Sequence, residues 1–450
     1  MQNNLRNKII KFLKNLGLLI FGLVMGLLLV EFLLGLIPEE TINTFIARHP
    51  IRYHIYQTDP DIGWRLKPNA QYQYMPEDNQ YVLIQTNSNG LNDIESQVQK
   101  PEGVYRILIL GDSFTEAAQV PIGQNFSRLL ADCLNKYYPQ PIEVINGGVS
   151  YYSSAEELFF LQHVGVQYQP DLVLTAFYVG NDIDTYSARK SQDGWFDTFG
   201  GYLIELDETG QLKKQWIDWQ NPSPYENVSS IELFLRRHFL IYRLLTHSDS
   251  KLADWLDGPK DQLKTFFFGL FAASMPKPPA RPSKADYKND LDLMIFHPDF
   301  PDGLDMPPQV KEAWAIIKEV FKQLQTESAS INAHMGVLII PTLEQAHADF
   351  YQEAYHKYSN RYGITIAGIN WDYTKPDQAL GQILSQKNIP YLDLLPAFKL
   401  YDATHPNEYL YFTRNGHFNQ AGHQLTAEAT CQWVKEQQFI PDLTSQPAPE

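Results

Sequence analysis

Five short apolar runs, separated by stretches long enough to hold helices, limit the possible folds of this 450-residue chain more than any other feature. The runs are Tyr105–Leu110, Ile142–Ile145, Leu172–Tyr178, Gly336–Ile340 and Tyr391–Leu395. Short apolar runs without polar alternation are typical of strands that are buried on both faces, as in a parallel sheet covered by helices. The pattern therefore predicts an α/β fold of three layers with a five-stranded parallel sheet.

The third and fourth runs lie far apart, so the sequence predicts a large insertion over residues 186–308. It opens with a segment rich in Trp and Gly and continues with a helical stretch, Ser230–Leu245. Two interpretations stay open: a small hairpin subdomain with an ordinary packing helix, or a lid or substrate platform whose aromatic faces stack on sugar rings.

Residues 38–104, before the first run, are predicted to form a β-rich preamble with a turn at Asn89–Gly90. Residues 441–450 are expected to form a tail.

The N-terminus carries an apolar stretch over residues 16–37 that is interrupted by one acid, Glu31. A helix of this length spans about 33 Å, which is enough to cross the hydrocarbon core of a membrane. The preceding residues 1–15 contain four basic side chains and no acid, namely Arg6, Lys8, Lys11 and Lys14. The positive-inside rule then predicts a cytoplasmic basic tail, a single-pass anchor and a periplasmic or extracellular remainder. A cleaved signal peptide is the alternative, but no small-x-small cleavage site follows Val30.

Composition narrows the possible partners and cofactors. The formal net charge of −16 disfavours a nucleic-acid partner, because no broad attraction to phosphate is available. The only cysteines, Cys133 and Cys431, form no C-x-x-C pair. We interpret them as buried apolar side chains rather than as a long-range disulfide. No metal cluster, phosphate loop or dinucleotide fingerprint is present, so neither a metal nor another cofactor is expected.

A candidate nucleophile follows the first apolar run, in the tripeptide Gly111-Asp112-Ser113. A serine at this point lies at the carboxyl edge of the sheet, where open α/β folds bind their ligands. The tripeptide alone is weak evidence, because Asp-Ser is also a common helix-capping pair.

Three further motifs follow in order, and together the four resemble the blocks of the SGNH/GDSL hydrolase superfamily. The blocks are GDSFTE at Gly111–Glu116, NGGVSYYS at Asn146–Ser153, GND at Gly180–Asp182 and NGHFNQAGH at Asn415–His423. Four matched blocks are far more specific than one. The resemblance implies a flavodoxin-like hydrolase domain over residues 105–440, interrupted by the insertion.

The resemblance also implies a role for each matched residue. Ser113 would be the nucleophile and His417 the base that takes its proton, because a serine hydroxyl is a poor nucleophile on its own. Gly148 and Asn181 would complete an oxyanion hole with the main-chain N–H of Ser113. His423 is interpreted as a solvated or packing histidine.

This sequence departs from the family at the residue that orients the histidine. Many members carry an Asp shortly before it, whereas here the preceding residues are Arg414-Asn415-Gly416. Asn415 is neutral, so it cannot stabilise an imidazolium by charge. Three alternatives stay open: a Ser-His pair oriented by Asn415 or a backbone carbonyl, an acid such as Asp402 from elsewhere in the chain, or an inactive protein.

By resemblance, the chain is expected to be a serine esterase that acts through an acyl-serine intermediate. Its substrates would be acyl esters, O-acetyl esters foremost, of envelope carbohydrate or lipid. One alternative is an O-acyltransferase that modifies extracellular polysaccharide. Another is a catalytically impaired polysaccharide-binding protein.

Overall fold

The computed structural model describes residues 2–36, 55–77, 80–183, 200–218, 234, 238–239, 308–347, 350, 374–413 and 415–441. The chain divides into two compact units, one of residues 1–53 and 219–276 and one of residues 54–218 and 277–450. The sheet and every predicted site residue belong to the second unit.

A five-stranded parallel sheet forms the centre of the second unit, in the order β11-β10-β7-β5-β6. The strands are β5 (Tyr105–Gly111), β6 (Ile142–Gly148), β7 (Leu172–Tyr178), β10 (His334–Ile340) and β11 (Tyr391–Asp393). Each of the five apolar runs is therefore a strand, as predicted. Numbered along the chain, the order is that of the flavodoxin-like doubly wound sheet, so the predicted five-stranded parallel α/β sheet is confirmed.

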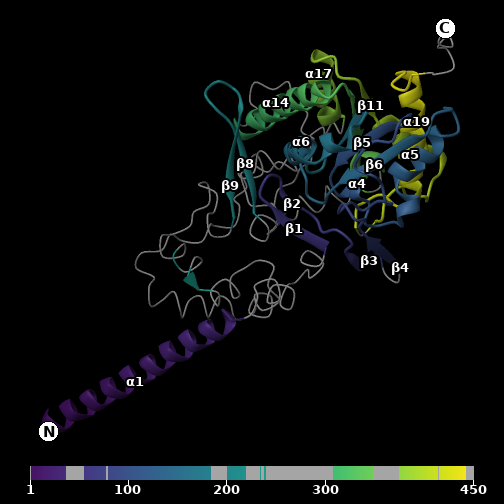
Figure 1. The fold of residues 1–450 in the computed structure, drawn as a ribbon. Coiled ribbons are helices and arrows are strands. Elements are labelled where there is room, and N and C mark those ends of the chain that lie inside the picture. Colours follow the sequence, from purple (N-terminus) through teal and green to yellow (C-terminus); the bar gives the residue numbers. More distant parts are fainter. Residues whose placement is uncertain are drawn as a thin grey trace, which may run out of the picture. The chain divides into compact units, whose positions relative to one another are not determined.

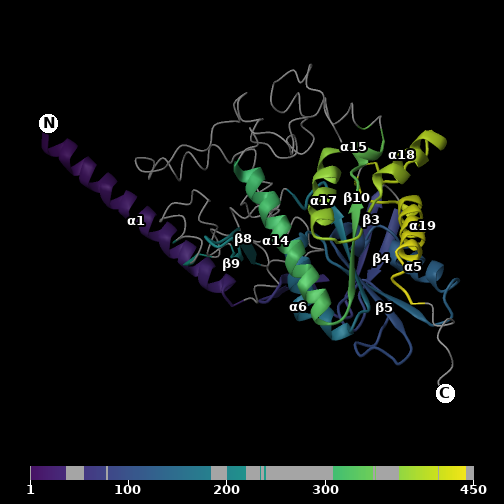
Figure 2. The same cartoon turned by 90° about the horizontal axis from the view of Figure 1, so that it is seen from above.

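Helices cover both faces of the sheet (Figure 1, Figure 2). On one face lie α6 (Ser154–His163) and α14 (Pro308–Ser330), and on the other lie α5 (Phe126–Leu134) and α19 (Gln420–Glu436). Side-chain caps define where three of them begin: Asn125 caps α5, Asn419 caps α19, and Ser153 and Glu156 form a capping box on α6. The remaining helical elements are α4 (Ser113–Glu116), η1 (Ile122–Gln124), η2 (Gly165–Tyr168), α15 (Leu343–Ala346), α17 (Lys375–Gln386) and α18 (Leu395–Thr404).

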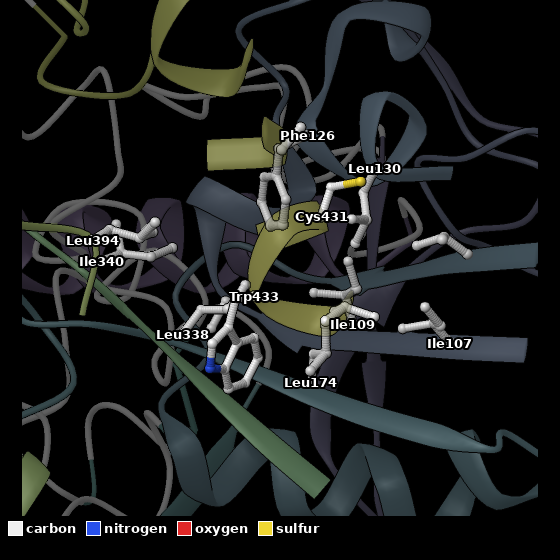
Figure 3. Close-up of a cluster of buried hydrophobic side chains, with 14 of the residues drawn as sticks. Ile107, Ile109, Phe126, Leu130, Leu174, Leu338, Ile340, Leu394, Cys431 and Trp433 are labelled. Carbon is white, nitrogen blue, oxygen red and sulfur yellow. The ribbon is translucent and has the colours of Figure 1, made fainter. Parts of the chain in front are cut away.

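A hydrophobic core lies between the sheet and the α5/α19 layer (Figure 3). Strand residues such as Ile109 and Leu174 meet Phe126 of α5 and Trp433 of α19. A Cβ at Gly336 would lie 2.7 Å from the Trp433 ring, so the absence of a side chain there lets the indole lie on β10.

A disulfide joins α5 to α19, which corrects the interpretation of the two cysteines as separate apolar side chains. Cys133 and Cys431 are bonded, with their Cα atoms 6.3 Å apart. Residues 298 positions apart in the sequence meet because their helices pack side by side on one face of the sheet. The sequence did not predict the disulfide, because no local pattern around either cysteine indicates that α5 and α19 pack together.

The described part of the preamble contains four strands. Strands β1 (Tyr56–Asp59) and β2 (Gly63–Leu66) form one antiparallel pair, and β3 (Gln71–Glu77) and β4 (Gln80–Gln85) form another. The predicted turn is present, with Gly90 at φ +75°, where a Cβ would lie only 2.6 Å from the Leu66 carbonyl oxygen.

The described part of the insertion is a hairpin of β8 (Gly201–Leu206) and β9 (Leu212–Ile217). Its aromatic side chains face other protein groups: Tyr202 packs edge-on against Trp216 at 5.2 Å and against Phe159 at 5.6 Å between ring centroids. Lys214 Nζ lies 4.5 Å from the centre of the Tyr202 ring. Residues 200–218 therefore fit the hairpin interpretation. The helix expected over Ser230–Leu245 lies outside the described residues.

In the first unit, α1 runs from Gln2 to Leu34. Within the part of the chain that the structure describes, no helix is both long enough and apolar enough to cross a membrane. The anchor expected over residues 16–37 therefore stays a prediction.

Candidate active site

The four sequence blocks meet at the carboxyl edge of the sheet. Ser113 begins α4, directly after β5, while the second and third blocks overlap or follow the ends of β6 and β7. The chain leaves β5 for the α5 face and β7 for the α14 face, so a topological switch point lies between these two neighbouring strands. Doubly wound folds bind their ligands at such a point.

Ser113 and His417 are in direct contact. Ser113 Oγ lies 2.7 Å from His417 Nε2. The imidazole also stacks on Phe114, with ring centroids 4.8 Å apart and planes 27° apart. These two contacts hold the ring between α4 and the loop that carries it.

A tight loop before α19 presents His417. Tyr411 and Phe418 form an antiparallel bridge, and the Phe412 N–H donates to the His417 carbonyl oxygen at 2.8 Å. Gly416 has φ +78°, a conformation that glycine adopts without strain. The tight turn therefore explains why a glycine stands between Asn415 and His417.

The main-chain oxygen of Asn415, rather than its side-chain amide, faces His417. His417 Nδ1 lies 3.2 Å from this carbonyl oxygen. Because a carbonyl only accepts, Nδ1 carries the proton and Nε2 presents its lone pair to Ser113. This is the tautomer that a general base requires.

Asp402, the candidate acid from elsewhere, does not reach His417. It hydrogen-bonds to His347 Nδ1 at 2.6 Å, so this expectation is wrong. The pairing was hidden because the sequence does not show which histidine α18 approaches. Among the described residues no carboxylate hydrogen-bonds to His417.

Because no described carboxylate counteracts it, desolvation of the His417 ring is the main influence on the pKa of this histidine. Desolvation lowers the pKa of His417 to about 4, and the Asn415 carbonyl raises it only in part. The imidazole is thus neutral at neutral pH. It can accept a proton from Ser113, although no negatively charged side chain in the described part of the chain hydrogen-bonds to it and stabilises the product.

Asn181 and Gly148 both lie against the nucleophile segment. Asn181 Nδ2 donates to Asp112 Oδ2 at 2.8 Å, and the other Asp112 oxygen caps α4 by accepting from the Phe114 N–H at 2.9 Å. A Cβ on Gly148 would lie 2.3 Å from the Glu116 nitrogen, so only glycine permits this close approach of β6 to α4.

The N–H of Gly148 already has an acceptor in the protein. It donates to Asn146 Oδ1 at 2.9 Å, while Asn146 Nδ2 donates to the Thr115 carbonyl oxygen at 2.7 Å. The sequence alone did not indicate this role for Asn146, which begins the second block. Its position at the end of a strand, next to two glycines, was the available signal that it ties β6 to α4.

Four buried carboxyl groups lie behind the site, namely Asp112, Glu156, Glu157 and Asp182. Burial raises the pKa of each of them. Glu157 is the extreme case, because no described group hydrogen-bonds to its carboxyl oxygens and the neighbouring acids repel its charge. The raised pKa values favour the neutral form of these carboxyl groups, which lowers the repulsion between them. No set of three metal-ligating side chains was found among the described residues.

His423 is a packing residue, one of the two readings that the sequence left open. Its side chain is buried, and Nδ1 accepts from the Phe126 N–H at 3.3 Å. Its ring lies nearly parallel to Phe126, at 6.0 Å between centroids. Burial lowers its pKa to about 3, so it stays neutral.

Comparison with known proteins adds little to this geometry. No protein-family model matches the chain, and no curated protein sequence matches it. Solved structures with similarity to it include TesA, 10% identical over 74% of this chain and 99% of that one, with a TM-score of 0.34. A second is Axe2, an acetylxylan esterase from Geobacillus stearothermophilus, 12% identical over 73% of this chain and 94% of that one, with a TM-score of 0.33. A third is a two-domain esterase active on acetylated mannans, 10% identical over 77% of this chain and 52% of that one, with a TM-score of 0.35. At such TM-scores the alignments carry no conclusion about this chain, and its own strand order establishes the fold.

Proposed function

We propose that this chain is a serine ester hydrolase of the SGNH/GDSL type. The observation that carries the proposal is the 2.7 Å contact between Ser113 Oγ and the lone-pair nitrogen of His417, whose other nitrogen donates to a carbonyl oxygen. A serine paired with a correctly protonated histidine is the arrangement that makes its oxygen nucleophilic.

In the proposed reaction, Ser113 Oγ attacks the ester carbonyl carbon while its proton moves to His417 Nε2. The tetrahedral oxyanion would be stabilised by the Ser113 N–H and by Asn181, with Gly148 as a third donor that must share its N–H with Asn146. His417 then gives its proton to the departing alcohol, which leaves an acyl-serine. Water, deprotonated by His417, releases the acid and restores Ser113.

The neutral surroundings of His417 predict a slow enzyme rather than an inactive one. Replacement of the triad Asp by Asn in a serine protease lowers kcat about 10⁴-fold, largely because the histidine takes the wrong tautomer. Here the Asn415 carbonyl holds the right tautomer, so that part of the loss is avoided. The loss of kcat that remains comes from the missing negative charge beside the imidazolium.

We place the substrate among acyl esters, O-acetyl esters foremost, of envelope carbohydrate or lipid. The predicted anchor over residues 16–37 would hold the catalytic unit at the envelope, in the periplasm or outside the cell, with the N-terminus in the cytoplasm. The Cys133–Cys431 disulfide supports this placement, because disulfides persist mainly in oxidising compartments.

The test is hydrolysis of p-nitrophenyl acetate by the full chain in detergent, together with labelling by a fluorophosphonate probe. We expect turnover and labelling in the parent, neither in Ser113→Ala, and both in the remote control Ser330→Ala. Labelling of Ser113 without hydrolysis would favour acyl transfer to a sugar hydroxyl over hydrolysis. Absence of both in a folded parent would refute the proposal and favour a polysaccharide-binding protein.

A further inference from the structure

We infer that Tyr74, from the preamble hairpin, is a positioning residue that acts through Asn415 to hold the general base. The inference rests on the proposed function. It assigns to the β3–β4 hairpin the task that an acidic side chain would perform beside His417.

Three residues form a continuous chain of hydrogen bonds toward the nucleophile. Asn415 Nδ2 donates to the Tyr74 hydroxyl oxygen at 2.8 Å. The main-chain oxygen of the same Asn415 accepts from His417 Nδ1 at 3.2 Å, and His417 Nε2 contacts Ser113 Oγ at 2.7 Å. Residue 415 thus connects the hairpin to the base with two different groups, its side-chain amide and its peptide carbonyl.

The carbonyl needs such an anchor because it belongs to a short turn. A peptide carbonyl points where the φ and ψ angles on either side direct it, and Gly416, the next residue, offers little steric restriction. Among the described residues, Tyr74 is the only hydrogen-bond partner of the Asn415 side chain, because Asn415 Oδ1 has no partner there. Loss of the Tyr74 hydroxyl would leave a half-buried amide without a protein partner and release the carbonyl from its orientation.

The preamble also contacts the nucleophile segment, which is an independent indication that it belongs to the catalytic unit. The Tyr56 hydroxyl lies 2.8 and 2.9 Å from the two carboxyl oxygens of Glu116, in the same helical turn as Ser113. Asn92 Nδ2 donates to the Glu116 carbonyl oxygen at 2.7 Å. The preamble therefore binds one segment next to Ser113 and another next to His417.

A purely structural role for Tyr74 predicts a different result from a positioning role. If Tyr74 only stabilises the fold, its loss should lower stability whether or not Asn415 has an amide. If it acts through the polar side chain of residue 415, its catalytic effect should disappear once that side chain is removed. A double-mutant cycle separates the two cases.

The experiment compares the parent, Tyr74→Phe, Asn415→Ala and the double variant, all as full chains, with Tyr81→Phe as the matched control. Tyr81 lies on β4 of the same hairpin, and its side chain is exposed. We expect Tyr74→Phe to lower kcat by about 5-fold, as for loss of one hydrogen bond, with KM unchanged. The rate of fluorophosphonate labelling should fall by the same factor, and Tyr81→Phe should match the parent. In the Asn415→Ala background, Tyr74→Phe should have no further effect.

Asn415→Asp provides a second background that keeps the contact. Its carboxylate can accept a hydrogen bond from the Tyr74 hydroxyl, so Tyr74→Phe should again reduce turnover there. Equal kcat in Tyr74→Phe and Tyr81→Phe would overturn the inference, as would a loss of the same size in the parent and in the Asn415→Ala background. If the parent itself neither turns over nor labels, the proposed function fails and the inference with it.

Discussion

Acid should inhibit ester hydrolysis by this protein only at an unusually low pH. The general base must be neutral to accept the Ser113 proton, and desolvation lowers the pKa of His417 to about 4. At about pH 5, a histidine with that pKa is about 90% neutral, whereas one with the ordinary value of about 6.5 is only about 3% neutral. At about pH 5 the structure therefore predicts about 30-fold more of the enzyme with a neutral base than an ordinary histidine would give, so kcat/KM should stay near its plateau value there.

The assay is kcat/KM for p-nitrophenyl acetate between about pH 3.5 and pH 8, because this ratio reports the pKa of the free enzyme. Samples are stopped and brought to alkaline pH before reading, and Ser113→Ala provides the background. Asn415→Asp is the informative companion, because a carboxylate close to His417 should raise its pKa and move the acid limb to higher pH. An acid limb near pH 6.5 in the parent would refute the reasoning.

Unfolding must be separated from titration at low pH. Burial lowers the pKa of His417 to about 4 and that of His423 to about 3. Below about pH 6.5 the unfolded chain binds protons at both histidines while the folded chain does not, so their contribution to stability is lost as the pH falls through the folded pKa values. Circular dichroism at each pH shows whether the activity limb precedes unfolding.

Two further predictions concern stability. Burial and neighbouring acids raise the pKa of Glu157, so the folded chain holds this proton to higher pH than the unfolded chain does. Glu157→Gln should therefore stabilise the protein more as the pH rises above about 4.5, the ordinary pKa of the group. Urea unfolding at about pH 5 and pH 8 checks this, and the same gain at both would contradict it. Reduction of the Cys133–Cys431 disulfide, which closes a 298-residue separation, should lower the free energy of unfolding by about 5 kcal/mol. Cys133→Ala/Cys431→Ala should reproduce the loss in thermal unfolding, and an unchanged Tm in both cases would count against a structural bridge.

The strands and the order of the blocks could be predicted because they depend on local sequence. A strand buried on both faces needs a continuous apolar run, and each of the five runs is a strand in the structure. Parallel strands end at one edge, so blocks placed after β5, β6 and β7 had to meet there. Gly148 was identified from its block, and the structure shows the reason for a glycine there, since a Cβ would lie 2.3 Å from the Glu116 nitrogen.

Partners across the fold were decided only by the tertiary structure. The two cysteines form a disulfide because α5 and α19 lie side by side, and Asp402 meets His347 rather than His417 because of where α18 lies. The sequence by itself determined that an asparagine precedes the histidine. Only the packing of the preamble against the His417 loop decided that its carbonyl faces the base while its amide binds Tyr74. Such contacts join residues that are distant in the chain, and their geometry depends on the whole arrangement of helices and strands rather than on any local pattern.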